Sequence, residues 1–84
     1  MQYKDNMCLL IPVDSEFFEM LSDLCYSICY QTGSSFYWLY PGSSDSLMAI
    51  FSFKTQVQKE NASRLMEEGC KEVPLTAYTL IENF

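Results

Sequence analysis

The sequence predicts an α+β fold in which two helices cover one face of a four-stranded antiparallel sheet. Two segments carry apolar residues at helical spacing, and four segments have the length and the aliphatic or aromatic composition of strands. Along the chain these elements follow in the order strand, helix, strand, strand, helix, strand. With 84 residues, the chain is expected to form one domain over residues 1–84, and a domain of this size buries only about 60% of its unfolded surface.

The first strand and the first helix are the most clearly marked elements. Residues 7–13, MCLLIPV, are a continuous apolar run with a proline near its end, as expected for a central strand. Asp14 and Ser15 follow, and either side chain can cap a helix. We expect that helix from about residue 16 to about residue 32, ended by Gly33 in a left-handed conformation. Its apolar stripe consists of Phe17, Leu21, Leu24, Cys25 and Ile28.

The second and third strands are predicted to form a hairpin. Residues 34–42, SSFYWLYPG, are rich in aromatics and bounded by turn formers. A loop at 41–45 leads to the returning strand at 46–54. Side chains alternate between the two faces of a strand. We expect Leu47, Ala49, Phe51 and Phe53 to face the helices, and Phe36, Trp38 and Tyr40 to lie on the opposite, open face of the sheet.

The last two elements complete the pattern. Thr55 begins a capping box in which Gln58 reaches back, and a helix is expected over about 56–68 with Gly69 as its terminator. Residues 72–84 are predicted to form the last strand, and Pro74 indicates that this strand lies at an edge or starts late. The order βαββαβ is that of the ferredoxin-like fold, in which strands one and three are central. This prediction depends on the order of the elements and not on resemblance to a sequence family.

The predicted open face of the sheet is too apolar for contact with water alone. Alternation places apolar side chains on both faces of the strands, and a monomer rarely leaves a large apolar patch uncovered. We therefore expect this face to bind a second copy or another partner. The predicted patch consists of Cys8, Leu10, Met48, Ile50, Tyr78 and Leu80.

Charge is distributed unevenly along the chain. The net charge is −6, and no lysine, arginine or histidine occurs between Lys4 and Lys54. A one-sided acidic field repels nucleic acid and attracts basic surfaces, although a net charge of this size also serves solubility. The outer side of the first helix is expected to present Glu16, Glu19 and Asp23, flanked by Tyr26 and Tyr30.

The sequence contains few residues of the types that form a catalytic site. The chain has no histidine to act as a base, and its four cysteines form no CxxC pair. Cys25 and Cys29 are predicted to be buried small hydrophobes rather than metal ligands. Asp14 is predicted to cap a helix rather than to hold a metal ion. We therefore expect no catalytic site, no metal, no cofactor and no nucleic-acid binding.

The predicted function is that of a small acidic, non-enzymatic protein-interaction domain. No signal peptide and no membrane-spanning run is visible, so a cytoplasmic location with reduced thiols is expected, with two disulfides in a secreted domain as the alternative. A phage-type inhibitor that blocks the basic surface of a host defence protein is one such function, and a homodimeric regulatory or ligand-sensing domain is the alternative. The predicted partner-binding residues are Glu16, Glu19, Asp23, Tyr26, Tyr30, Phe36, Trp38 and Tyr40.

Overall fold

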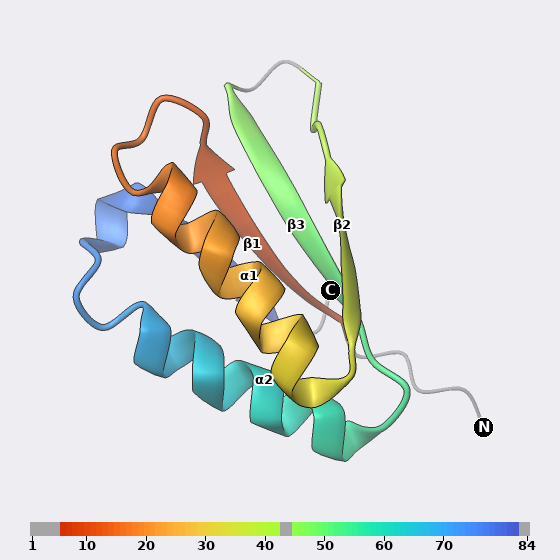
Figure 1. Ribbon diagram of the computed structural model, residues 1–84. Coiled ribbons are helices and arrows are strands. Elements are labelled where there is room, and N and C mark those ends of the chain that lie inside the picture. The colour runs from red at the N-terminus through yellow and green to blue at the C-terminus, as the bar shows by residue number, and fades with distance from the viewer. Residues whose placement is uncertain (1–5, 43–44, 83–84) are drawn as a thin grey trace.

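A computed structural model describes residues 6–42 and 45–82, and these residues form a two-layer α+β arrangement. Both helices lie against one face of a four-stranded antiparallel sheet with the strand order β2-β3-β1-β4 (Figure 1). This is the ferredoxin-like βαββαβ order that the sequence predicts. The elements are β1 (Met7–Pro12), α1 (Phe18–Thr32), β2 (Ser35–Leu39), β3 (Ser46–Ser52), α2 (Gln56–Gly69), a short 3₁₀ helix (Leu75–Ala77) and β4 (Thr79–Glu82).

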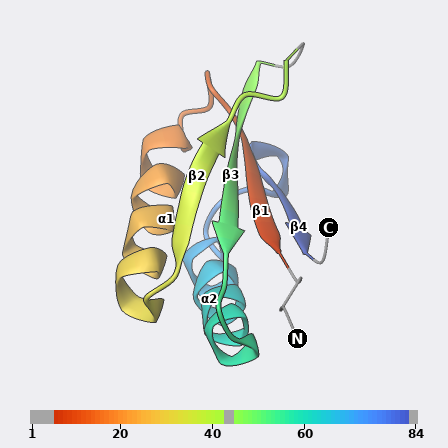
Figure 2. The ribbon, with the colours of Figure 1, turned by 90° about the vertical axis from the view of Figure 1, so that its right-hand side faces the viewer.

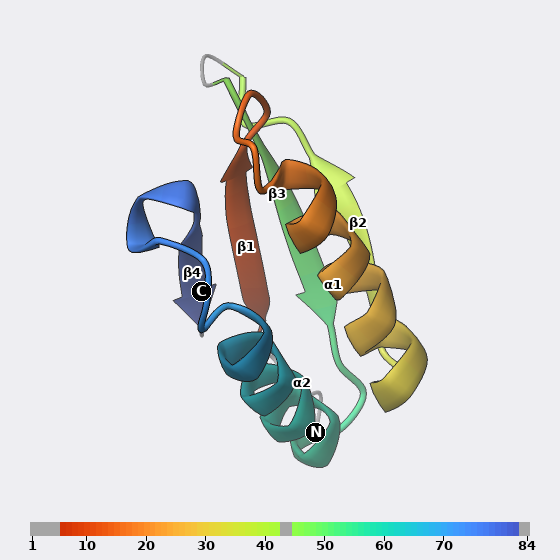
Figure 3. The same ribbon diagram turned by 60° about the vertical axis from the view of Figure 1, so that its left-hand side comes forward.

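The central position of β1 and β3 follows from their composition. β1 is paired on both sides, antiparallel to β3 and to β4. Its MCLLIP sequence suits a strand whose backbone donors and acceptors are used on both edges. The two faces of the sheet differ in what covers them. Figure 2 looks onto the sheet face that carries no helix, and Figure 3 shows α1 and α2 crossing the other face.

The core lies between the helices and the sheet. Met7, Leu9 and Ile11 of β1 are fully buried there, together with Ala49 and Phe51 of β3. The helices contribute the other half of this layer: Leu21, Cys25 and Ile28 from α1, and Ala62 and Met66 from α2. At about 25 cal/mol for each Å² of apolar surface removed from water, burial of each large side chain contributes roughly 1.5–3 kcal/mol.

The start of α1 differs from the prediction, whereas its end agrees. The helix begins at Phe18, two residues later than predicted, and Phe17 occupies the N-cap position without a side-chain capping bond. The Ser15 hydroxyl accepts a hydrogen bond from the Phe17 N–H at 3.1 Å instead. Asp14 is therefore not the helix cap. Gly33 ends the helix with φ = 73°, and its N–H donates to the Cys29 carbonyl.

The start of α2 is fixed by two polar side chains. The Thr55 hydroxyl accepts a hydrogen bond from the Gln58 N–H at 3.1 Å. The side-chain oxygen Oε1 of Gln58 accepts a hydrogen bond from the Lys54 N–H at 2.8 Å, and the side-chain nitrogen Nε2 of Gln58 donates to the Gly33 backbone carbonyl at 3.4 Å. Gln58 thus connects the start of α2 to the end of α1.

Gly69 ends α2, as predicted, but without the left-handed conformation that ends α1 at Gly33. It is the last residue of α2, and the glycines with positive φ in the described residues are Gly33 and Gly42. A Cβ placed at Gly69 would lie 2.5 Å from Cδ1 and 3.1 Å from Cγ of Leu24 on α1. A side chain at Gly69 would therefore meet Leu24 where the two helices approach closely, and this contact rather than a backbone turn favours glycine here.

β4 begins later than residue 72, as Pro74 indicated. Pro74 has an extended conformation and precedes the 3₁₀ helix, and its carbonyl accepts a hydrogen bond from the Ala77 N–H at 2.9 Å. Pairing with β1 starts only at Thr79, opposite Leu10. Of the predicted hairpin loop between β2 and β3, Ser43 and Ser44 lie outside the described residues.

Candidate interaction surfaces

A chain of aromatic contacts links α1 to the sheet and decides which way β2 faces. Phe18 on α1 stacks on Trp38, with ring centroids 5.9 Å apart and an interplanar angle of 23°. Trp38 meets Phe36 edge to face at 5.4 Å, and Phe36 stacks on Phe51 at 5.2 Å. Tyr26 completes the group with an edge contact to Phe36 at 4.9 Å. Such pairs contribute about 0.5–1.5 kcal/mol each beyond the area that they bury.

The prediction that Phe36 and Trp38 lie on the open face of the sheet is therefore wrong. Both are half-buried on the helix side, where they pack against the core. Tyr40 lies beyond the end of β2 and is exposed. The side chains of β2 that point to the open face are Tyr37 and Leu39, which are 55% and 45% exposed.

The open face contains two rows of side chains that cross all four strands, and the shorter pairs Ser35–Ser52 and Pro12–Ser46 lie at the ends of these rows. Directly paired residues share a face, so the register of the three strand pairs defines both rows. Tyr78 and Leu80, predicted to lie here, instead pack against the core on the helix side. Thr79 and Ile81 take their places. From β2 to β4, the complete rows are Tyr37, Ile50, Cys8 and Ile81 in one, and Leu39, Met48, Leu10 and Thr79 in the other.

The sequence did place four of these eight side chains on the open face: Cys8, Leu10, Met48 and Ile50. The structure buries Cys8 and Ile50, while Leu10 and Met48 are half-buried. The four that were missed lie on the edge strands β2 and β4. Apolar residues occur on both faces of those strands, so composition alone could not show which face of each strand meets the helices. The pairing register with β3 and β1 could have shown it.

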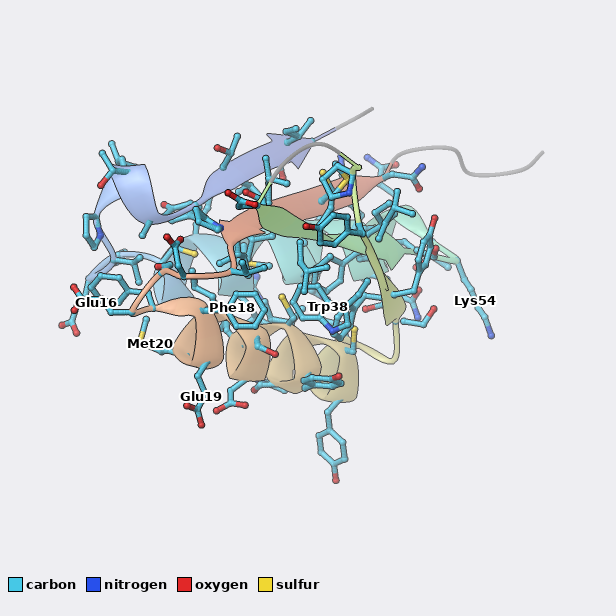
Figure 4. The ribbon with its side chains drawn as sticks, turned by 90° about the horizontal axis from the view of Figure 1, so that it is seen from above. Glu16, Phe18, Glu19, Met20, Trp38 and Lys54 are labelled. Carbon is cyan, nitrogen blue, oxygen red and sulfur yellow. The ribbon has the colours of Figure 1, made fainter. Side chains whose placement is uncertain are left out.

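The acidic face of α1 comprises Glu16, which lies two residues ahead of the helix, and Glu19, Asp23, Tyr26 and Tyr30 on its outer side, with Tyr26 at the border where it contacts Phe36 of β2. All five side chains are exposed, as predicted, and Tyr30 is 92% exposed. Figure 4 shows Glu19 directed outward from the helix, while Phe18 beside it is directed toward Trp38. The helical period of 3.6 residues produces this division.

Within the described residues, the basic side chains lie elsewhere. Lys54, Lys59, Arg64 and Lys71 all belong to α2 or its flanks, and Lys54 lies at the opposite end of the molecule from Glu16 (Figure 4). The segment from residue 6 to residue 53 contains no basic residue at all. The carboxylates of the acidic face are therefore not neutralised by basic neighbours on their own helix.

A hollow of about 330 Å³ lies beside the loop between β1 and α1. Asp14 and Glu16 are among its lining residues, so it lies between the acidic face and the 3₁₀ helix. The whole lining is Pro12, Asp14, Ser15, Glu16, Phe17, Pro74, Thr76 and Ala77.

Three of the four cysteines cluster between α1 and α2 and have the properties of core residues. Burial raises the pKa of the Cys25 thiol to about 12, and the neighbouring thiols of Cys29 and Cys70 add to this effect. Burial also raises the pKa of Cys29 and of Cys70. A thiol is nucleophilic only as the thiolate, so these are poor nucleophiles at neutral pH. In the described residues, all four cysteines are free and no group of three or more His, Cys, Asp or Glu side chains is arranged to hold a metal ion.

Comparison of the chain with protein-family models, with curated proteins and with solved structures finds no significant match. Neither helix in the described part of the chain combines the length and apolar composition needed to cross a bilayer. The roles of the acidic face of α1 and of the open face of the sheet therefore follow from the residues that form them.

Proposed function

We propose that this chain is a non-enzymatic protein-interaction domain whose acidic face of α1 binds a basic surface on another protein. The observation that carries the proposal is the segregation of charge: exposed carboxylates and exposed tyrosines share one helix face, within a segment that has no basic residue. Tyrosine is enriched at binding hot spots because it combines a large apolar ring with a hydroxyl. Complementary charge increases the rate of encounter with a basic partner.

A basic surface that normally holds nucleic acid is the partner that this chemistry suits best. Helix carboxylates can occupy the positions of phosphates, and a protein so bound can no longer take up nucleic acid. An inhibitor of a host defence protein, encoded by a phage and acting in the host cytoplasm, would work in this way. A homodimeric regulatory or ligand-sensing domain is the second candidate function, and the apolar open face supports it.

The test removes charge from the acidic face without changing its shape. The variant replaces Glu16 and Glu19 by glutamine and Asp23 by asparagine. Binding to the basic partner, isolated by crosslinking and identified by mass spectrometry, is then measured by calorimetry at low and high salt. Exposed ion pairs contribute about 0.2–1 kcal/mol each, so loss of three pairs is expected to weaken binding roughly tenfold.

The matched control removes three exposed carboxylates from α2 and its C-terminal flank. Glu67, Glu68 and Glu72 are replaced by glutamine, which changes the net charge by the same amount. We expect the control to bind within about twofold of the unmodified protein. Equal weakening by both variants would show that net charge alone matters, and the acidic face of α1 would not be the binding site.

A further inference from the structure

We propose that the open face of the sheet binds the open face of a second copy of this chain. This surface lies on the opposite side of the sheet from α1, so the proposal is independent of the partner proposed for the acidic face. Tyr37, Leu39 and Ile81 are 55%, 45% and 37% exposed on it. Apolar side chains exposed to this extent on a sheet face indicate a contact surface.

The lack of charge on this face identifies the second copy as its occupant. None of the described side chains in the two complete rows is charged, and the shorter pairs at their ends add only Pro12 and three serines, Ser35, Ser46 and Ser52. Two chains of net charge −6 repel each other, and they can approach most easily through the surface that carries none of this charge. A basic protein, by contrast, finds no carboxylate here to pair with.

The shape of the face also suits a second sheet. Sheets pack face to face at about 10 Å, with strands within about 30° of alignment and side chains interdigitating between them. One row has Tyr37 and Ile81 at its edges and the small, buried Cys8 near its centre. A second copy presents the same uncharged pattern, as two-fold symmetry requires.

The size of the face predicts a reversible dimer rather than a permanent one. Four strands at a spacing of about 4.8 Å give a width of roughly 19 Å, and six residues at about 3.3 Å give a length of roughly 20 Å. The footprint is thus roughly 380 Å² per copy, well below the roughly 800 Å² of standard stable interfaces. We therefore expect association in the micromolar to millimolar range of concentration.

The experiment is sedimentation equilibrium of the full chain from about 10 µM to about 1 mM, the range expected for so small an interface. The unmodified protein is expected to shift from monomer to dimer over this range. Leu39→Glu places a carboxylate in the contact of both copies, and dimerisation is expected to weaken at least tenfold. Ile81→Glu, at the opposite edge of the sheet, is expected to have the same effect.

Val57→Glu is the matched control, because Val57 is an exposed apolar residue on α2, outside the open face. It adds the same charge and is expected to leave dimerisation within about twofold of the unmodified protein. Circular dichroism verifies that all three variants are folded. A monomer at every concentration would overturn the proposal, and so would equal weakening by Leu39→Glu and Val57→Glu.

Salt and partner binding distinguish this proposal from the function proposed above. An apolar contact is not weakened by salt, whereas binding through the acidic face is. Leu39→Glu is expected to retain binding to a basic partner. The variant in which Glu16, Glu19 and Asp23 are neutralised is expected to retain the dimer. A dimer that dissociates as salt is raised would also contradict the assignment to the open face.

Discussion

Replacement of Gly69 by alanine tests the close approach of the two helices. The new Cβ would lie 2.5 Å and 2.6 Å from the two methyl carbons of Leu24, and 3.1 Å from its Cγ. Since all three distances are shorter than ordinary carbon contacts, the whole Leu24 side chain has to move, not only one methyl group. Overpacking of this kind costs about 1–3 kcal/mol.

Two smaller effects oppose this cost. Alanine is a better helix former than glycine by up to about 1 kcal/mol, and it also restricts the unfolded chain. Both effects are reduced at Gly69 because it is the last residue of α2. We therefore expect Gly69→Ala to lower the free energy of unfolding by about 1–2 kcal/mol, measured by urea titration with Trp38 fluorescence.

A double-mutant cycle identifies the cause. In a Leu24→Ala background the obstructing carbons are absent, and Gly69→Ala is expected to be neutral or to stabilise by up to about 1 kcal/mol. The coupling between the two positions should therefore be about 1–3 kcal/mol. If Gly69→Ala destabilises both backgrounds equally, steric conflict with Leu24 is not the reason for glycine at this position.

Three further predictions concern the core and the caps. Trp38→Ala should lower the free energy of unfolding by about 2–4 kcal/mol through lost contacts with Phe18, and a loss below about 1 kcal/mol would contradict its place on the helix side. Because burial raises the pKa of Cys25 from 9.0 to about 12, the unfolded chain releases that proton first as pH rises. The free energy of unfolding should therefore fall by up to about 1.4 kcal/mol per pH unit between these two pKa values. When the free energy of unfolding is measured by urea titration across this pH range, Cys25→Ala should show a smaller decrease per pH unit than the unmodified protein. Thr55→Ala should cost about 1 kcal/mol and Thr55→Ser only a few tenths in the same titration, and equal costs would show that the hydroxyl bonded to Gln58 is not a cap.

The order of the elements and the central strands could be predicted from sequence because a single pattern dominates each of them. The stripe on α1 has one apolar side and one polar side, so Glu19 and Leu21 could be assigned to opposite faces. β1 could be identified from its unbroken apolar run, and its faces followed from simple alternation. Gly33 follows a long helical pattern, where the left-handed conformation is the ordinary ending.

The face of β2 could not be predicted in the same way, since Phe36 and Tyr37 are both aromatic. Hydrophobicity selects a face only when the two sides of a strand differ. The hairpin register decides instead: Phe36 is paired directly with Phe51, which faces the helices. A slip by one residue would place Tyr37 there, and nothing in the local composition excludes that slip.

The role of Gly69 was also beyond local sequence reasoning. A glycine after an amphipathic segment usually marks a left-handed helix end, and the sequence around Gly69 fits that pattern. The reason for glycine here is a contact with Leu24, 45 positions away (69 − 24) along the chain. Only the packing of α1 against α2 reveals it.

The hydrogen bonds of the Gln58 side chain couple the local unfolding of the end of α1 to that of the start of α2. One side chain bonds to the Lys54 N–H ahead of α2 and to the Gly33 carbonyl behind α1. Helix ends normally unravel independently and exchange their amide hydrogens early. Here the C-terminal turn of α1 and the first turn of α2 should open together, so that their amides exchange with deuterium at a common rate.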